Sequence, residues 1–513
     1  MFPNSGDLKR ILLFGAGKSA TSLIDYLIQN LSSHQWELVV ADGNLKLAQD
    51  KTRNMHGTFA VGVDVQNDSQ RNALVQGADI VISMLPPALH FLVAKDCVEF
   101  GKNLLTASYV DDHIRSLQNE IHNKGLLFLC EMGLDPGIDH MSAMQIIHGI
   151  REEGGTIHSF YSHCGGLVAP ESDDNPWHYK ISWNPRNIIL AGKSGATFKE
   201  NGEVKFLPYD GLFDPYRQVK VHELGNFAWY PNRDSLSYIP LYQLEDSMNF
   251  VRTTLRHPDF CLGWKNVVQL KLTDETVQYD TDGLTLRNFY KIHFETHGFS
   301  DWLKNNLNTR FNMVKDLLEK TTDLIEAEDQ AKQFAVQEGL EFDPNMLFVN
   351  KTGELKDVNL DDLKSDAQSA VLQKMYEANL SLKLLFYLGL DSDEPINLGK
   401  CSAADVLQFV AEKRMALGPL DKDMIVMLHQ FGYTLNGKNY WVDSSLVAKG
   451  EDQVHTAMAK TVGLPLGIAT KLILEDKITL KGLHIPVMPE VYEPVLKELE
   501  ILGISFKENK KEL

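Results

Sequence analysis

The stretch from Arg10 to Asp42 constrains the fold more than any other part of this chain. Its pattern predicts an apolar strand, a glycine turn, a helix and a second apolar strand that ends in an acid. Gly15 permits a tight bend, Gly17 lets the backbone approach a pyrophosphate, and Ala20 lets the helix pack closely on the strand. The stretch therefore predicts a phosphate-binding turn, whose ligand would bind the free N–H groups at the start of the helix.

Asp42, at the end of the second predicted strand, indicates which dinucleotide would bind. It follows Ala20 by roughly the 20 residues expected of an acid that hydrogen-bonds a ribose 2′-hydroxyl. A 2′-phosphate at this place would meet a like charge. The sequence therefore predicts NAD, with NADP as the alternative cofactor. The competing interpretation is a glycine turn of an α/β domain that binds no ligand.

Short apolar runs continue the α/β pattern after Asp42. Near-continuous hydrophobicity in short strands is typical of a parallel sheet covered on both faces. Six such strands are expected, at residues 11–14, 39–42, 59–63, 79–84, 103–107 and 126–130. Because ligands of such sheets bind beyond the carboxyl ends of the strands, we expect the functional residues there.

The chain is expected to divide into three parts within the α/β class. Residues 1–141 predict a Rossmann-type doubly wound parallel sheet, completed by C-terminal helices in residues 452–513. Residues 142–272 and 420–451 predict a mixed α/β substrate domain. Residues 273–419 are mostly helical in pattern, including runs at 314–335 and 361–388, and predict an insertion into that domain.

Composition excludes several classes of partner. The net charge of −19 argues against nucleic acid or an anionic membrane as the main partner. The five cysteines form no Cys-x-x-Cys pair, so neither a disulfide framework nor a metal site is expected. No apolar run approaches the ~20 residues of a membrane span, and the first strand starts too early to leave room for a leader. These features predict a cytoplasmic protein.

Several further segments combine glycine, proline, aromatic and charged residues in ways that carry a family signature. They lie at residues 106–110, 133–140, 164–171, 174–183, 230–235, 254–256, 422–427 and 456–465. In these segments, and in their order, the chain resembles the glutamate-forming saccharopine dehydrogenases nearly end to end. The resemblance is strongest to the dehydrogenase half of the bifunctional animal enzyme. Fungal members prefer NADP and lack an acid like Asp42, so at this position the chain is similar to the animal type.

The resemblance implies an oxidoreductase of lysine metabolism. Its substrate would be saccharopine, which NAD(P)⁺ and water convert to L-glutamate and 2-aminoadipate 6-semialdehyde. Such chemistry needs a neutral amine, a hydride acceptor and groups that move protons while water adds. The resemblance also implies a homodimer formed through the substrate domain.

The resemblance also implies which residues form the site. The catalytic candidates are Tyr109, Asp135 and Cys164. The candidates for binding substrate are Tyr109, Val110, Asp135, Arg233, Thr254, Leu255 and Arg256. The candidates for binding the cofactor are Gly15, Ala16, Gly17, Lys18, Asp42, Asp64, Ser83, Met84, Ser108, Tyr109, Gly133, Leu134, Asp135, Pro136, Gly137, Ile138, Asp139, His140 and Asn184. His140 and His178 are weaker candidates for moving protons.

Each of these side chains also has a purely structural interpretation. Arg233 and Arg256 suit substrate carboxylates because a guanidinium donates two parallel hydrogen bonds, but either could form a surface salt bridge. Asp135 could accept the amine proton, orient water or cap the following helix. Tyr109 could donate to substrate or only pack, and Cys164 could be a small apolar residue of the core.

Three other functions remain open on the sequence alone. A related dehydrogenase could reduce another imine, made from an amino acid or a polyamine. A dinucleotide-binding regulator without turnover would keep the glycine turn and use the insertion for a partner. A cysteine hydrolase using Cys164 with His163 or His178 would leave the dinucleotide pattern unexplained.

Overall fold

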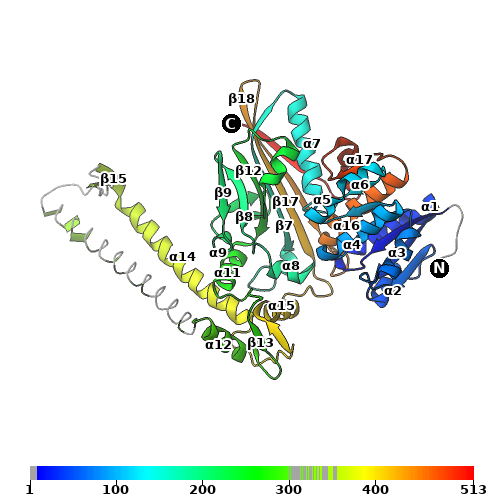
Figure 1. Ribbon diagram of the computed structural model, residues 1–513. Helices are drawn as coiled ribbons and strands as arrows, with labels where there is room; N and C mark the ends of the chain where they lie inside the picture. The colour runs from blue at the N-terminus through cyan, green and yellow to red at the C-terminus, as the bar shows by residue number, and fades with distance from the viewer. Residues whose placement is uncertain are drawn as a thin grey trace. The chain divides into compact units, whose positions relative to one another are not determined.

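The computed structural model describes residues 8–299, 301, 345–349 and 355–513, together with isolated positions between 312 and 337. The chain divides into two compact units (Figure 1). One unit comprises Met1–Cys261 and Ala411–Leu513, and the other comprises Leu262–Val410. The first unit contains both large sheets and all the residues of the candidate site.

A seven-stranded parallel sheet forms the first half of this unit. Its strand order is β19-β6-β5-β4-β1-β2-β3. Its strands are β1 (Lys9–Phe14), β2 (Trp36–Asp42), β3 (Thr58–Gly62), β4 (Ile80–Ser83), β5 (Asn103–Thr106), β6 (Leu127–Leu129) and β19 (Gly482–His484). The predicted doubly wound order is confirmed for the first six strands. The seventh strand, β19, was not predicted, because it is only three residues long and lies far along the chain.

Helices cover both faces of the parallel sheet, as its continuous hydrophobicity predicts. Those following its strands are α1 (Thr21–His34), α2 (Leu45–Thr52), α3 (Asp68–Gln76), α4 (Pro87–Phe100), α5 (Asp112–Ser116) and α6 (Gln118–Asn123). Successive residues of β1 enter different cores. Ile11 and Leu13 pack in the core that includes α1, whereas Leu12 and Phe14 pack with residues of α3 and α4.

The C-terminal helices α16 (Ala457–Leu474) and α17 (Pro489–Ile501) pack on the first half, as the tail pattern predicts. The sequence predicts no segment able to span a membrane, and α16 corrects this. It is the one helix of the described chain whose length and composition would suffice. However, 83% of its 18-residue window is buried inside the protein, against α1. This burial makes α16 a core helix of the fold.

A nine-stranded mixed sheet forms the second half of the unit. The main path runs β10-β11-β12-β7-β17-β18-β20, and β8 and β9 attach beside β12. Its strands are β7 (Thr156–Val168), β8 (Ala196–Glu200), β9 (Glu203–Leu207), β10 (Gln218–Val221), β11 (Gly225–Pro231), β12 (Asn249–Arg256), β17 (Asp423–Leu435), β18 (Lys438–Lys449) and β20 (Lys507–Glu512). Only the β12–β7 pair is parallel. Helix α7 (Ile138–Glu152) connects β6 to β7 and so joins the two halves.

Short helices lie in the connections between strands of the mixed sheet. They are α8 (Pro185–Ile189), α9 (Tyr209–Leu212) and α10 (Ile239–Tyr242), and α11 (Pro258–Gln269) follows β12. The second unit contains the remaining described elements. These are α12 (Leu286–Thr296), α14 (Leu360–Tyr387), β13 (Gln278–Asp280), β14 (Asn345–Val349), β15 (Leu355–Asn359) and β16 (Lys400–Ser402), with most of α15 (Ala403–Arg414), whose last residues belong to the first unit. The predicted helix at 361–388 is confirmed by α14, whereas the one at 314–335 lies mostly outside the described residues.

Candidate active site

The glycine turn adopts the conformation that its sequence predicts. Gly15 has a φ of 98°, and a Cβ there would come within 2.8 Å of the Met84 carbonyl oxygen. A Cβ on Gly17 would meet nothing within 4 Å. Packing within the described protein therefore does not explain Gly17, and the open space beside it fits a ligand that approaches the backbone. The residues present suit a dinucleotide.

Asp42 is tied to the glycine turn. One of its carboxylate oxygens accepts the Ala16 N–H and the other accepts the Asn44 N–H, both at 2.8 Å. These bonds fix the acid at the end of β2. Each oxygen retains a second lone pair, so Asp42 can still accept hydrogen bonds from ribose hydroxyls.

A buried histidine links the ends of β4 and β5. His90 lies on α4, with its Nδ1 2.8 Å from the Ser83 hydroxyl and its Nε2 2.7 Å from the Ser108 hydroxyl. Burial lowers the pKa of His90 to about 4, so the ring is neutral at pH 7. Of its two nitrogens, one therefore donates and the other accepts. The imidazole sets which serine hydroxyl remains able to donate toward a ligand.

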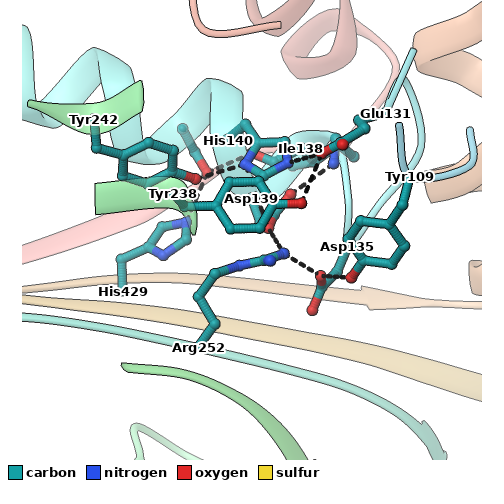
Figure 2. A network of polar contacts seen from close by, with 12 residues as sticks. Tyr109, Glu131, Asp135, Ile138, Asp139, His140, Tyr238, Tyr242, Arg252 and His429 are labelled. Carbon is teal, nitrogen blue, oxygen red and sulfur yellow. Dashed lines mark hydrogen bonds and ion pairs between the residues drawn. The ribbon is translucent and has the colours of Figure 1, made fainter. Parts of the chain in front are cut away.

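A network of polar side chains lies beyond the end of β6 (Figure 2). The Arg252 guanidinium contacts Asp135 Oδ1 at 2.7 Å and Asp139 Oδ2 at 2.8 Å. The Tyr109 hydroxyl donates to Asp135 Oδ1 at 3.2 Å. One guanidinium from β12 thus holds two carboxylates that belong to the loop before α7 and to its first turn.

The network continues through Glu131 and His140. His140 Nε2 lies 2.8 Å from Glu131 Oε2, and its Nδ1 lies 2.6 Å from the Tyr242 hydroxyl. Tyr238 donates its hydroxyl to the same Glu131 oxygen at 3.1 Å, and its ring lies 4.3 Å from the Arg252 guanidinium. These groups are buried and hydrogen-bonded to one another, so they fix Arg252 and the first turn of α7.

The two carboxyls on Arg252 have opposite pKa shifts. Burial raises the pKa of Asp135, although Arg252 works against that effect. Burial alone would also raise the pKa of Asp139, but His140, Arg252 and the Gly137 N–H together bring it below its usual value. Asp139 is therefore the permanent counter-ion, and Asp135 is the carboxyl suited to exchange a proton.

The structure decides between the two interpretations of Asp135. Helix α7 has Gly137 as its N-cap residue, with no side-chain cap. It is Asp139, not Asp135, that accepts the Gly137 N–H, at 2.6 Å. The Asp135 side chain instead faces Tyr109 and Arg252. Helix capping is therefore not its role.

Arg256 is a buried cation without an acidic partner among the described residues. It is only 4% exposed, and its Nη1 donates to the Leu255 and Gly166 carbonyls at 2.8 and 3.4 Å. Its Nε has no partner, and its guanidinium lies 5.1 Å from the Tyr179 ring. A buried, uncompensated guanidinium is costly unless an anion joins it. Arg256 is therefore built to take a carboxylate.

Comparison with known proteins agrees with this arrangement. Residues 11–129 match the family described as saccharopine dehydrogenase NADP binding domain, and residues 133–504 match the saccharopine dehydrogenase C-terminal domain. The chain belongs to the saccharopine dehydrogenase family.

Relatives in this family cover almost the whole chain. A yeast protein, saccharopine dehydrogenase [NADP(+), L-glutamate-forming] of Saccharomyces cerevisiae, is 29% identical over 98% of this chain and 99% of its own length. The alpha-aminoadipic semialdehyde synthases of Arabidopsis thaliana and Bos taurus are each 30% identical. The chain spans about half of their length, 44% and 48% respectively.

A solved structure confirms the fold of this saccharopine dehydrogenase family member. It is an apo saccharopine dehydrogenase (L-Glu forming) from Saccharomyces cerevisiae, with a TM-score of 0.76 and 27% identity. The match covers 98% of this chain and all of the other chain. The α/β class, with a Rossmann-type sheet and a mixed second sheet, is therefore shown.

The structure brings many of the predicted site residues together. Thr254 lies on β12 between Arg252 and Arg256, and it pairs with Cys164 on β7. Burial raises the pKa of the Cys164 thiol well above its usual value, so the thiol stays neutral and forms only weak hydrogen bonds. Arg233 is exposed, and its guanidinium lies 5.1 Å from the Tyr109 ring. The Val110 N–H donates to Glu131 at 3.0 Å.

Other predicted residues lie apart from the polar network. Leu255 faces the opposite side of the mixed sheet, in a cluster with Leu167 and Val426. Asn184 caps α8 by accepting the Arg186 N–H. Asp64, after β3, accepts the Gln66 N–H in a local turn. Among these three, only Asp64 lies directly beyond a strand of the parallel sheet.

The hydrolase alternative finds no support in the geometry. His163 and Cys164 are successive residues of β7, so their side chains point to opposite faces of the sheet. His163 Nδ1 lies 2.6 Å from the Thr253 hydroxyl instead. His178 pairs with Asp173, Nδ1 to Oδ2, at 2.6 Å. No described histidine is hydrogen-bonded to the Cys164 sulfur.

Sequence reasoning missed several residues of the network. Arg252 and Glu131 are its central members, and His90 links two predicted cofactor residues. The period-two alternation of β12 was the available signal for Arg252, because it shares a face with Thr254 and Arg256. No comparable pattern marks Glu131, which lies between β6 and α7 with a φ of 58°.

Proposed function

We propose that this chain is an L-glutamate-forming saccharopine dehydrogenase. It oxidises saccharopine with NAD(P)⁺ and water to L-glutamate and 2-aminoadipate 6-semialdehyde. The Asp135 carboxyl carries this proposal, because its raised pKa suits proton exchange and it is held between Tyr109 and Arg252. The printed names of the yeast, plant and animal relatives support the same activity.

Asp135 moves protons in the proposed reaction. In its ionised form it accepts the proton of the secondary amine, which leaves the nitrogen neutral for oxidation. That proton then passes from Asp135 to solvent. After the iminium ion forms, the ionised carboxyl takes a proton from the attacking water and returns it to the glutamate nitrogen, which leaves as the carbinolamine hydroxyl loses its proton and becomes the aldehyde oxygen. The Tyr109 phenol, whose pKa burial raises, stays protonated and keeps Asp135 oriented. Cys164 contributes no covalent step.

The arginines bind the substrate carboxylates. Arg256 has its unpartnered Nε and a buried guanidinium for one of them, and the exposed Arg233 is available for a second. A polyamine would leave Arg256 without an anion. This favours saccharopine over the polyamine substrates of related imine-reducing enzymes.

The dinucleotide would be held by the Gly15–Gly17 turn, Asp42 and the serines that His90 links. When bound, it accepts the hydride from the lysine-side carbon of the substrate. We propose NAD as the preferred form, because Asp42 would repel a 2′-phosphate. The family description and the yeast names give NADP instead, so NADP remains the alternative.

A direct assay tests the activity. Purified protein mixed with saccharopine and NAD⁺ is expected to show rising near-ultraviolet absorbance from the reduced nicotinamide, and Asp135→Asn is expected to lower kcat by roughly 10²–10⁴-fold. No turnover with either NAD⁺ or NADP⁺ would overturn the proposal. Tight NADH binding without turnover would favour the regulator instead.

A matched pair of variants tests the cofactor preference. Asp42→Ala is expected to lower the ratio of kcat/KM for NAD⁺ over NADP⁺ at least tenfold. Asp50→Ala removes the same charge from the exposed side of α2 and is expected to leave the ratio unchanged. An unchanged ratio in Asp42→Ala would defeat the assignment of Asp42 to the ribose.

We also infer a homodimer formed through the mixed sheet, and a cytoplasmic location. The family resemblance supports the first, and the buried, free state of all five cysteines agrees with a reducing compartment. Light scattering of the purified protein tests the dimer, since a monomeric mass at assay concentrations would contradict it. Fractionation of cells tests the location.

A further inference from the structure

A cluster of two histidines and an aspartate lies outside the network of Figure 2. His178 follows the loop after β7, whereas His257 and Asp259 lie between β12 and the first turn of α11. One potential ligand atom from each residue lies within 4.8 Å of the others. The Asp259 Oδ2 atom is 3.5 Å from His178 Nε2 and 3.9 Å from His257 Nδ1.

We propose that His178, His257 and Asp259 bind a divalent transition-metal ion of the Zn²⁺ class. Two imidazoles and a carboxylate are a common ligand set for such ions, and the fourth position would be taken by water. Ligand atoms about 2.0–2.1 Å from a tetrahedral ion lie roughly 3.3 Å apart. The distances from Asp259 Oδ2 to His178 Nε2 and His257 Nδ1, 3.5 and 3.9 Å, would need to shorten by roughly 0.2 and 0.6 Å.

Hydrogen bonds fix which nitrogen of each ring carries the proton. His178 Nδ1 lies 2.6 Å from Asp173 Oδ2, which fixes the proton on Nδ1 and leaves the Nε2 lone pair toward Asp259. A carboxylate behind a metal-binding imidazole is the usual supporting contact at such sites. His257 Nδ1 accepts the Asp259 N–H at 3.2 Å, so this nitrogen carries no proton, and a metal ion bound there would replace that hydrogen bond.

The conformation of the cluster agrees with a binding role. His178 has a φ of 49°, a strained backbone position for a residue with a Cβ. The two imidazole rings lie 3.9 Å apart, which is unfavourable if both are charged.

A metal-free arrangement is the competing explanation. In it, a protonated His178 bridges the carboxylates of Asp259 and Asp173, whose hydrogen bonds raise the pKa of His178. This arrangement satisfies His178 and leaves His257 Nδ1 accepting the Asp259 N–H at the start of α11. The two explanations differ in whether the protein takes up metal.

Metal binding would also connect two segments that approach the proposed substrate pocket. Tyr179 follows His178 in sequence, and Arg256 precedes His257, with the Arg256 guanidinium 5.1 Å from the Tyr179 ring. An ion would hold these segments together and so restrict the position of Arg256. This consequence rests on the proposed function, whereas the binding of metal does not.

Metal uptake by the full-length protein tests the proposal. The protein is freed of metal with a chelator, desalted and titrated with Zn²⁺ by calorimetry. The expected result is one equivalent bound per chain. His257→Gln and His178→Asn, the latter tolerant of a positive φ, are each expected to weaken binding at least tenfold. Asp173→Asn is expected to weaken it by roughly 10–100-fold.

Controls separate loss of the site from loss of fold. His222→Gln removes an exposed histidine away from the cluster and is expected to bind Zn²⁺ like the wild type. The metal-free melting temperatures of all variants are compared, and the Asp173 variant leaves the three ligands in place. A wild type that takes up no Zn²⁺ would overturn the proposal and favour the metal-free arrangement. Equal binding by the cluster variants and the wild type would also overturn it.

Discussion

Arg252 illustrates how one buried residue can assign different tasks to two similar acids. Its guanidinium contacts both Asp135 and Asp139, but Asp139 gains further bonds from the Gly137 N–H. The difference in surroundings pushes the pKa values of the two acids in opposite directions. Arg252 is thus needed both for the stability of this region and for the orientation of Asp135.

Replacing Arg252 is expected to be costly. Arg252→Met should lower the free energy of unfolding by about 3–5 kcal/mol at pH 7, because it leaves the ionised Asp139 buried without its partner. Denaturant unfolding measures the loss. The double variant Arg252→Met/Asp139→Asn should recover part of it. A loss no larger than that of Arg233→Met, at an exposed arginine, would contradict the assignment.

His90 predicts a specific dependence of stability on pH. The pKa of His90 is about 4 in the folded protein, whereas its ordinary value is 6.5. Between these two pH values His90 is therefore protonated in the unfolded chain but neutral in the folded protein. Stability therefore falls as the pH falls through this window, by about 3 kcal/mol in total. His90→Gln removes the contribution of His90 to this pH dependence, whereas the contributions of the buried His163 and His429 remain.

The measurement is the free energy of unfolding of both proteins between pH 7 and pH 4. The difference in stability between the wild type and His90→Gln should shift in the variant's favour as the pH falls. Parallel curves for the two proteins would show that His90 is not held neutral.

Residues at the ends of predicted strands were the easiest part of the site to find. Asp42, Tyr109 and Asp135 follow apolar runs, and the geometry of parallel sheets places such residues beside a ligand. Arg252 lies inside a strand, where a charged residue is normally an exposed surface group, so its burial depends on tertiary packing. Its partners are more than 100 residues away. No local pattern could supply them.

At the scale of elements, hydrophobic periodicity located six strands of the parallel sheet and both tail helices. It failed for β19, since Gly482, Leu483 and His484 form too short a run to stand out from a loop. Hydrophobic periodicity also does not predict how closely the backbones of α16 and α1 approach each other. A Cβ at Gly463 would lie 2.8 Å from the Leu23 backbone nitrogen.

This close packing predicts opposite effects for two helical glycines. Gly463→Ala should destabilise the protein by about 1–3 kcal/mol, because α16 must move away from the α1 backbone. Gly149→Ala in α7 should stabilise it by about 0.5–1 kcal/mol, since its Cβ would meet nothing within 4 Å. Chemical denaturation checks both variants. Equal effects would mean that helix propensity alone governs both positions.

At the scale of the whole molecule, the chain forms two compact units, and the proposed cofactor site lies in only one of them. Scanning calorimetry is expected to show two transitions. NADH at 100 times its Kd should stabilise the transition of the first unit by about 2.7 kcal/mol and leave the other unchanged. Gly463→Ala identifies the first unit's transition, because it lowers that one alone. A single transition that shifts as a whole would contradict this prediction.

The pairing of β19 with β6 has a consequence for biosynthesis. The ribosome completes β6 at Leu129, but Gly482, where β19 begins, follows 353 residues later (482 minus 129). At typical rates of translation this interval lasts on the order of 20 to 70 seconds. Throughout it, the β6 edge of the dinucleotide-binding half has no partner from the nascent chain and is open to pairing with other chains. Final closure of the sheet must therefore wait until residues 482–484 have been synthesised.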